Sequence, residues 1–487
     1  MVSNLFKNRW AVLVLATVLL VISFFIPAVA LASALVALLV GVWALSYHLS
    51  FGWLVLVFLS PLINWELNLS WLQPSFSQYP WLYSMHAPVV EFWTVLLLLA
   101  FGISLVRQWR RGHTPTLVWP GIQWFALFVG SALVSLINVP PEERVDSLKY
   151  VAHFLLLFYF GYLLLAANVV DTKKLWRQSL VTLASVGFLA ALMGAISLVL
   201  GVWSGGGFHR AVPFAIFGWA PFGDQHIFLA EVITTTVPIF LFFWRQATDP
   251  QRKKQLAMAA WFVAIIGFLT LSRAGWVTMF AEAVLFFYLT RHENFWHEVW
   301  GVSRRGLVVV LPILLYFVYF LLTSPVVASS TSTRLSLTDM ALFLFREHPL
   351  VGQGVGTFTN RVVEFKIYTT EFGEALDAQG VVQKLLAEQG LLGLGTFVLF
   401  VGWIVLTILR RYRSEDYTAE ARGAYFVSLF LLASPLIFQL FNTQYYTSKM
   451  WIPIALALAQ SILYKKDTQV VKLTLNLKQI KSIQTEI

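Results

Sequence analysis

Residues 381–408 read VVQKLLAEQGLLGLGTFVLFVGWIVLTI, and no charged side chain follows Glu388 in this stretch. A transmembrane helix needs about 20 predominantly apolar residues. The stretch therefore predicts a helix that crosses a membrane. Its beginning is different, because Lys384 and Glu388 stand four positions apart and so share one face near the polar end of the helix.

The whole chain has the composition of a membrane protein. Of its 487 residues, 58% are hydrophobic and 12% are charged, which is more apolar surface than one water-soluble core hides. Helices satisfy their own backbone hydrogen bonds in lipid, whereas open sheets do not. We therefore expect an all-α fold, a polytopic transmembrane helical bundle. The net charge of +10 is spread over many short loops, so no nucleic acid is expected as a partner.

Apolar windows and the breakers between them predict about 12 to 14 membrane spans. Short linkers within 31–64 and 256–290 are also compatible with re-entrant pairs. The predicted segments are 10–29, 31–48, 50–64, 88–106, 118–138, 149–169, 178–202, 226–244, 256–271, 274–290, 306–323, 381–408, 423–441 and 449–464.

The basic residues predict the orientation of these spans. Most of the 34 Lys and Arg residues fall in loops of one parity, as the positive-inside rule requires of cytoplasmic loops. We expect a multi-pass protein of the cytoplasmic (inner) membrane with both termini in the cytoplasm. The clusters that decide this are Arg107, Arg110 and Arg111; Lys173, Lys174 and Arg177; Arg252, Lys253 and Lys254; Arg304 and Arg305; Arg410, Arg411 and Arg413; and Lys465 and Lys466.

The windows also divide the chain into three parts. Residues 1–203 are predicted to form an N-terminal transmembrane scaffold. Residues 204–464 form a transmembrane core, which includes a large, partly helical extracytoplasmic loop at 324–380. Residues 465–487 form a basic cytoplasmic tail, which either touches anionic lipid or is a disordered end.

The large loop carries the signals of a helix. Ser336-Leu-Thr-Asp339 has the spacing of a capping box, with Asp in place of the usual Glu or Gln. An apolar run follows, and His348-Pro349 would end the helix. We expect this helix to begin near Ser336 and to lie on the membrane surface or against the bundle.

Four arginines lie on the predicted outer side, where topology leaves few cations. They are Arg210, Arg273, Arg334 and Arg361. Guanidinium groups form paired hydrogen bonds with phosphate oxygens, so a set that converges on one outer cavity would suit a lipid-linked phosphate or diphosphate. The alternative is that each arginine pairs with a nearby carboxylate or a lipid headgroup.

Histidines and glycines add weaker signals. His209, His226 and His348 are outer-side candidates for proton transfer. No histidine pair has the spacing of a metal site, and the chain has no cysteine, so we expect neither a metal nor a cofactor. The segment Gly352-Gln-Gly-Val-Gly356 either lets backbone N–H groups approach an anion or is a simple turn.

Four segments together resemble a known family. They are TLSRAGW (270–276), TRLSLTDMAL (333–342), HPLVGQGVGTF (348–358) and VVQKLLAEQGLLGLG (381–395). In this order they are similar to motifs of the superfamily of O-antigen ligases, O-antigen polymerases and O-oligosaccharyltransferases. The resemblance covers roughly residues 205–400, and the first 200 residues match only as a hydrophobic scaffold.

The resemblance implies a metal-independent glycosyltransferase of the GT-C kind. Its donor would be a glycan linked to undecaprenyl diphosphate, its acceptor a glycan, lipid or protein, and its active site would face outward. Transferred by position, Arg210, Arg273 and Arg334 would hold the diphosphate. The family motif has a histidine base eleven positions before the first of two glycines, and in this chain that position is Gln379.

Glutamine takes no proton at useful pH, which leaves three readings of the mechanism. Asp377 is the base, His348 approaches from the loop, or departure of the diphosphate drives the reaction without a base. Asp377 has an alternative role as a helix N-cap. Asp377, Lys384 and Glu388 share one helical stripe facing a cavity, although the Lys384–Glu388 pair is also explained as purely structural.

Two other function classes remain open from the residues. One is a transporter or flippase of lipid-linked saccharides, and the other is a catalytically inactive relative that binds lipid-linked glycan. Transporters usually bind their substrate near the middle of the membrane, whereas here the polar residues gather at one face. The sequence therefore favours the enzyme, without separating a ligase from a polymerase.

Overall fold

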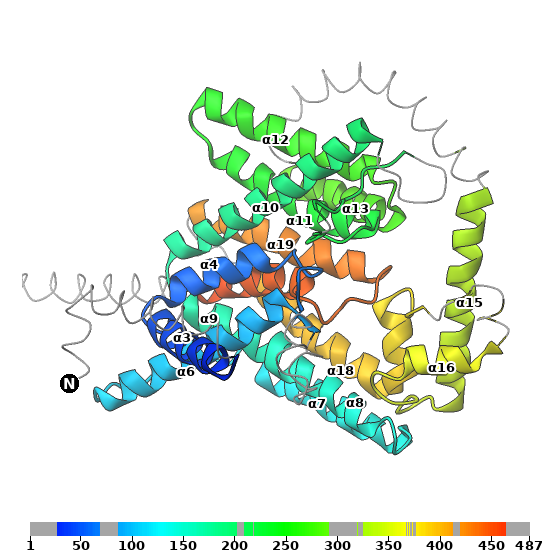
Figure 1. Ribbon diagram of the computed structural model, residues 1–487. Coiled ribbons are helices and arrows are strands. Elements are labelled where there is room, and N and C mark those ends of the chain that lie inside the picture. Colours follow the sequence, from blue (N-terminus) through cyan, green and yellow to red (C-terminus); the bar gives the residue numbers. More distant parts are fainter. Residues whose placement is uncertain are drawn as a thin grey trace, which may run out of the picture.

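A computed structural model describes residues 27–68, 86–201, 209–217, 219–291, 325–366, 376–412 and 419–463, together with residues 319, 368, 370 and 373. The described chain is a bundle of helices (Figure 1). Its only sheet among these residues is one antiparallel pair, β1 (Glu66–Asn68) with β2 (His86–Pro88). The prediction of an all-α, polytopic membrane protein is confirmed.

Among the described residues, six helices are long and apolar enough to cross a membrane. One of them is compound, because α8 (Arg144–His153) continues through the π-helical η3 (Phe154–Leu164) into α9 (Leu165–Val169). The other five are α6 (Val89–Arg110), α10 (Lys173–Leu200), α11 (His226–Gln246), α18 (Val381–Tyr412) and most of α19 (Ala419–Gln439). A bent pair, α3 (Pro27–Leu45) with α4 (Leu49–Leu59), makes a seventh candidate.

The number of spans by this measure is lower than the 12 to 14 that hydropathy windows predict. In the region 31–64 the two helices meet at 110°, the geometry of a broken span or re-entrant pair. Four other predicted spans are helices that are too short or too polar to qualify: α7 (Ile122–Ser135) with η2 (Leu136–Asn138), α12 (Pro250–Leu269), α13 (Arg273–Thr290) and the C-terminal helix Ser448–Leu463. The predicted spans 10–29 and 306–323 lie almost wholly outside the described residues, and the tail 465–487 lies outside them entirely.

The loop helix, α15 (Pro325–Glu347), begins earlier than predicted. The expected start at Ser336 is wrong, because residues 326–335 contain neither proline nor glycine to interrupt the helix, and Pro325 suits a first helical position. The helix ends before His348-Pro349, as expected. Its face of Leu337, Met340 and Leu344 is buried against the bundle in a cluster with Ala387 of α18.

A break in α18 organises this end of the bundle, where α15, α16 (Phe358–Glu364) and the start of α18 lie near one another (Figure 1). We call it the loop end. Gly390 has φ 62° and ψ −158° in the middle of the helix, a conformation that is essentially restricted to glycine. An added Cβ would lie 2.5 Å from the Leu350 carbonyl carbon. The glycine-rich loop after α15 therefore fits directly against the break.

Backbone hydrogen bonds join that loop to α18. The N–H groups of Gln353 and Gly354 donate to the carbonyls of Ala387 (2.9 Å) and Glu388 (2.8 Å). In return, Leu391 N donates to Pro349 O at 2.9 Å, and the next residue of α18 pairs with Leu350. The loop thus satisfies backbone groups that the broken helix would otherwise leave unpaired in an apolar environment.

We predict that Gly390→Ala destabilises the protein by more than about 2 kcal/mol, because alanine resists this backbone conformation and its methyl group meets the loop backbone. Gly395→Ala is the matched control in the same helix. Nothing lies within 4 Å of an added Cβ there, and alanine in a helix interior is favoured by about 0.5–1 kcal/mol. Chemical unfolding in detergent micelles measures both variants, and equal midpoints would contradict the role given to Gly390.

Candidate functional site

Three of the four outer arginines gather at the loop end, although they come from distant segments. Arg210 precedes α11, and its Nη1 lies 3.3 Å from Nε2 of His226, the first residue of α11. Arg273 is the first residue of α13, and its Nη1 donates to Thr331 Oγ1 of α15 at 2.8 Å. Arg334 lies on α15, almost one turn after Thr331. We call Arg210, Arg273 and Arg334, with His226, the arginine cluster.

Electrostatics confirm that these side chains are neighbours. Burial, and then the charge of Arg273, lowers the pKa of Arg334. Burial also lowers the pKa of Arg210. The charges of Arg210 and Arg334 both act on His226. Like charges that are brought together and partly desolvated do not stabilise a fold, and such a site is well suited to bind an anion with several oxygens.

Local capping and backbone bonds hold two of these arginines in place. Ser272 is the N-cap of α13, and its Oγ accepts the Gly275 N–H at 3.2 Å, which fixes Arg273 in the first turn. The residue after Arg210, Ala211, donates its N–H to Leu269 O at 2.8 Å. The segment SRAG and the end of α12 therefore bring Arg210 and Arg273 to the same corner of the bundle.

A second group of charges lies at the start of α18, with Lys384 and Glu388 on its first turns and Asp377 in the segment just before it. Lys384 Nζ is 2.6 Å from Asp377 Oδ2 and 3.8 Å from Glu388 Oε1. The Lys384 and Glu388 side chains are only 6% and 1% exposed, against 31% for Asp377, so the group opens outward at Asp377. The three residues predicted to share one helical stripe do come together, although Asp377 lies before the helix. We call them the lysine–carboxylate group.

The glycine-rich loop contributes to this group in one specific way. The N–H of Phe358, which follows the loop, donates to Glu388 Oε1 at 3.2 Å. Val355 N donates to Ser135 Oγ, and the Asn138 side chain donates to Gly352 O at 2.7 Å. The loop is a structural element that anchors α7 and α18, and the anion near its backbone is the carboxylate of Glu388.

Contacts between α15 and α18 connect the two groups. Gln383 Nε2 donates to Thr338 Oγ1 at 2.9 Å, and that hydroxyl donates to the carbonyl of Arg334 at 2.8 Å. Gln383 Oε1 in turn accepts the backbone N–H of Gln379 at 3.2 Å. The arginine cluster and the lysine–carboxylate group are therefore on adjoining helices at the same end of the bundle.

The three residues considered for acceptor activation differ in their surroundings. Asp377 Oδ2 binds Lys384, and Oδ1 accepts the Ala378 N–H at 2.9 Å, so both carboxylate oxygens already have partners. Gln379 donates from Nε2 to the carbonyl of Asp377 at 3.4 Å. His348 is exposed where α15 ends, and its carbonyl accepts the Gly352 N–H.

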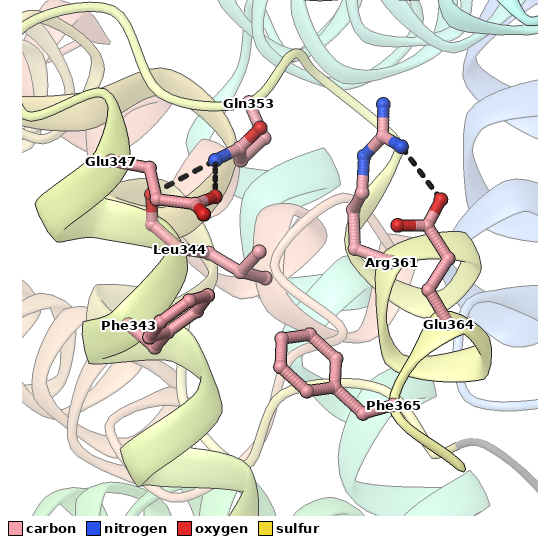
Figure 2. A pocket seen from close by; sticks show the side chains of 7 residues that line it. All are labelled: Phe343, Leu344, Glu347, Gln353, Arg361, Glu364 and Phe365. Atoms are coloured by element: carbon pink, nitrogen blue, oxygen red, sulfur yellow. Dashed lines mark hydrogen bonds and ion pairs between the residues drawn. The ribbon is translucent and has the colours of Figure 1, made fainter.

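Arg361 does not join the arginine cluster. Figure 2 shows it in a separate cavity of about 290 Å³, where its Nη1 is 2.7 Å from Glu364 Oε1. Gln353 and Glu347 line the same cavity and bind each other at 2.6 Å. The expectation that Arg361 helps to hold a diphosphate is therefore not supported. The alternative, that the arginine pairs with a nearby carboxylate, matches its contact with Glu364.

Sequence reasoning missed several polar residues at the loop end. Glu91 and His153 approach each other to 3.1 Å between Oε1 and Nε2, and Tyr446 lies against the His153 ring. Lys384 Nζ lies 5.6 Å and 6.0 Å from the ring centroids of Tyr150 and Tyr446. Glu91 and His153 stand near the starts of the apolar windows 88–106 and 149–169. An ionisable residue at the start of an apolar window is also the signal that identified Lys384.

A buried ion pair was also missed. Lys449 Nζ is 2.8 Å from Glu231 Oε2, and the two side chains are only 3% and 2% exposed. Gln439 Nε2 donates to the other oxygen of Glu231 at 2.8 Å. Lys449 also lies over the Phe228 ring at 4.5 Å. Together with Gln439, this pair joins α11, α19 and the C-terminal helix. Across the described residues, no three His, Cys, Asp or Glu side chains are grouped to hold a metal ion.

We predict that Lys384→Met destabilises the protein by about 3–5 kcal/mol, because it leaves the buried Glu388 carboxylate without its cation. Adding Glu388→Leu should recover part of the loss, since an apolar pair removes the unpaired charge. Lys149→Met is the control, because Lys149 and Asp146 are 73% and 79% exposed, and it should unfold like the parent. Denaturant unfolding in micelles tests this, and a double variant weaker than Lys384→Met alone would argue against it.

The sequence matches no protein-family model, and it has no significant match among curated proteins. The case for a function therefore rests on the residues themselves. Its strongest parts are the arginine cluster, the lysine–carboxylate group and the contacts that bring them to one end of the bundle.

Proposed function

We propose that this protein is a membrane glycosyltransferase that moves a glycan from a polyprenyl-diphosphate-linked donor to a glycan, lipid or protein acceptor. The observation that carries the proposal is the convergence of Arg210, Arg273 and Arg334 from three separate segments. Their resemblance to the arginines of O-antigen ligases and polymerases gives the donor its identity. The positive-inside distribution of basic residues favours an active site at the outer face of the cytoplasmic membrane.

The arginine cluster suits the chemistry of such a transfer. The bond between the anomeric carbon and the diphosphate oxygen breaks, and its electron pair leaves with the diphosphate. Negative charge therefore grows on the leaving group, and fixed guanidinium groups stabilise it more in the transition state than in the bound donor. Because Arg273 and Arg334 are held by α13 and α15, little reorganisation is needed as the charge develops.

The lysine–carboxylate group would lie on the acceptor side of the diphosphate. Contacts of Gln383 with Thr338 hold α18 beside the helix that carries Arg334. Asp377 and Gln379, at the exposed edge of the group, offer an oxygen and an amide that can bind sugar hydroxyls. Lys384 holds Asp377 in position. We assign binding and orientation of the sugar to these residues.

The rival reading as a transporter or flippase has less support. Transporters usually bind substrate near the middle of the membrane, between broken helices. The break in α18 at Gly390 is filled by the protein's own glycine-rich loop. The polar groups also gather at the loop end, which favours an enzyme that works at the membrane surface.

We predict that Arg273→Ala and Arg334→Ala each weaken binding of a polyprenyl diphosphate by roughly 10- to 100-fold, because each removes charge-assisted hydrogen bonds of about 1.5–3 kcal/mol. Glycan transfer to a panel of acceptors should fall in parallel. Arg361→Ala is the control, as Arg361 is paired with Glu364 in another cavity, and it should bind the donor like the parent. Binding is measured on purified protein in nanodiscs with a labelled polyprenyl diphosphate.

Three results would count against the proposal. If the two cluster variants bind the labelled lipid as tightly as Arg361→Ala does, the arginine cluster is not the diphosphate site. If the parent binds the glycan-linked lipid but transfers nothing to any acceptor of the panel, the inactive, lipid-glycan-binding reading is preferred. Movement of labelled lipid between leaflets without any transfer would instead indicate a flippase.

A further inference from the structure

Glu91 and His153 form a pair that has no role in the site described above. Glu91 lies in the first turn of α6, and His153 is the last residue of α8, immediately before the π-helical η3. Oε1 of the carboxylate is 3.1 Å from Nε2 of the ring. The two side chains are 29% and 25% exposed, so a substrate can reach a pair that is nevertheless held in place. Segments of π-helix occur frequently at functional sites.

The two ring nitrogens of His153 have different surroundings. Nε2 is buried 3.1 Å from Glu91 Oε1, an approach without the alignment of a hydrogen bond, and Nδ1 has no hydrogen-bond partner within the described part of the chain. A carboxylate beside one nitrogen favours the tautomer with the proton on that nitrogen. The lone pair of Nδ1 is then available to accept a proton. A base oriented by a third group is the arrangement that enzymes use to activate hydroxyl nucleophiles.

Tyr446 places this pair beside the proposed sugar site. Its ring centroid is 5.9 Å from that of His153 and 6.0 Å from Lys384 Nζ. Tyr150, one turn before His153, lies 5.5 Å from Tyr446 between centroids and 5.6 Å from Lys384 Nζ. His153 and Lys384 therefore both lie beside the Tyr446 ring, and the flat face of such a ring suits the C–H groups of a sugar.

We propose that His153 is the catalytic base of the transfer and that Glu91 is its positioning residue. This inference rests on the proposed function. The acceptor hydroxyl oxygen bonds to the anomeric carbon as the bond from that carbon to the diphosphate breaks. The electron pair leaves with the diphosphate, and the hydroxyl proton moves to Nδ1 of His153, from which water removes it after the product departs.

His153 would thus supply the group that is missing at Gln379. The glutamine side chain cannot accept the proton, and both oxygens of Asp377 are occupied by Lys384 and the Ala378 N–H. His153 comes instead from the N-terminal part of the chain, through the packing of α8 beside the segment that carries Tyr446.

Several ionisable groups lie near His153. Glu91 approaches it from α6, Tyr446 lies beside it from the segment before the C-terminal helix, and Tyr150 is three positions earlier in its own helix. Lys384 lies near the Tyr446 ring. The carboxylate nearest to the His153 ring is that of Glu91.

The test uses the full-length protein in nanodiscs with a labelled polyprenyl-diphosphate glycan and an acceptor that the parent uses. We expect His153→Ala and the closer-sized His153→Gln to lower kcat by about 10²- to 10⁴-fold, with donor binding unchanged. Added imidazole should restore part of the rate of His153→Ala, more so as pH rises and imidazole loses its proton. His113→Ala, an exposed histidine in the loop after α6, is the control and should behave like the parent.

Glu91→Gln tests whether Glu91 positions the base or only supports the fold. Its kcat should fall while KM stays close to that of the parent, because the ring is no longer held by the carboxylate, and Glu91→Asp should stay close to the parent. If the parent and the His153 variants transfer glycan at the same kcat, the base assignment is overturned and the proposed function stands. The same conclusion follows if the variants lose only acceptor affinity and imidazole does not rescue them. A parent that binds donor but transfers nothing overturns both.

Discussion

The docking of the glycine-rich loop on the break in α18 is the contact on which the rest of the loop end depends. A membrane helix that is interrupted at Gly390 leaves carbonyl and N–H groups without partners, and such groups are costly in an apolar environment. The loop after α15 supplies those partners along its own backbone. The same contact sets the position of Glu388, and through it that of Lys384 and Asp377. A purely structural requirement thus places the charged side chains.

Charge at this end is sorted into groups with different chemistry. The arginine cluster collects like charges, which is unfavourable for folding and favourable for an anionic ligand. The lysine–carboxylate group and the Glu231–Lys449 pair are internally compensated, and they stabilise the helices that carry them. The Glu91–His153 pair is partly exposed. In the proposed transfer reaction, the arginine cluster, the lysine–carboxylate group and the Glu91–His153 pair would bind the diphosphate, bind the sugar and accept the proton, respectively.

Part of this site could be predicted from residue types and spacing. Arg210, Arg273 and Arg334 stand out as cations at the ends of apolar windows, and they do meet. Arg361 has the same appearance, but Glu364 three positions later provides a local partner. Within the described residues, fewer helices pass the test of length and hydropathy than the apolar windows predict, because a window detects apolar composition, whereas crossing a membrane also requires length. Glu91 and His153 were missed as a pair because 62 positions separate them along the chain.

The amino-acid sequence by itself determined that the protein is helical and multi-pass, since long apolar runs in lipid must satisfy their backbone groups within each helix. It also determined which helix ends are polar, and it placed Lys384 four residues before Glu388, a spacing that local geometry turns into a contact. Only the tertiary structure decided which ends share one site. Arg273 meets α15, and His153 meets Glu91 and Tyr446, through packing between segments that are far apart in the chain. Such pairings depend on the shapes of whole helices, and no local pattern of residues records them.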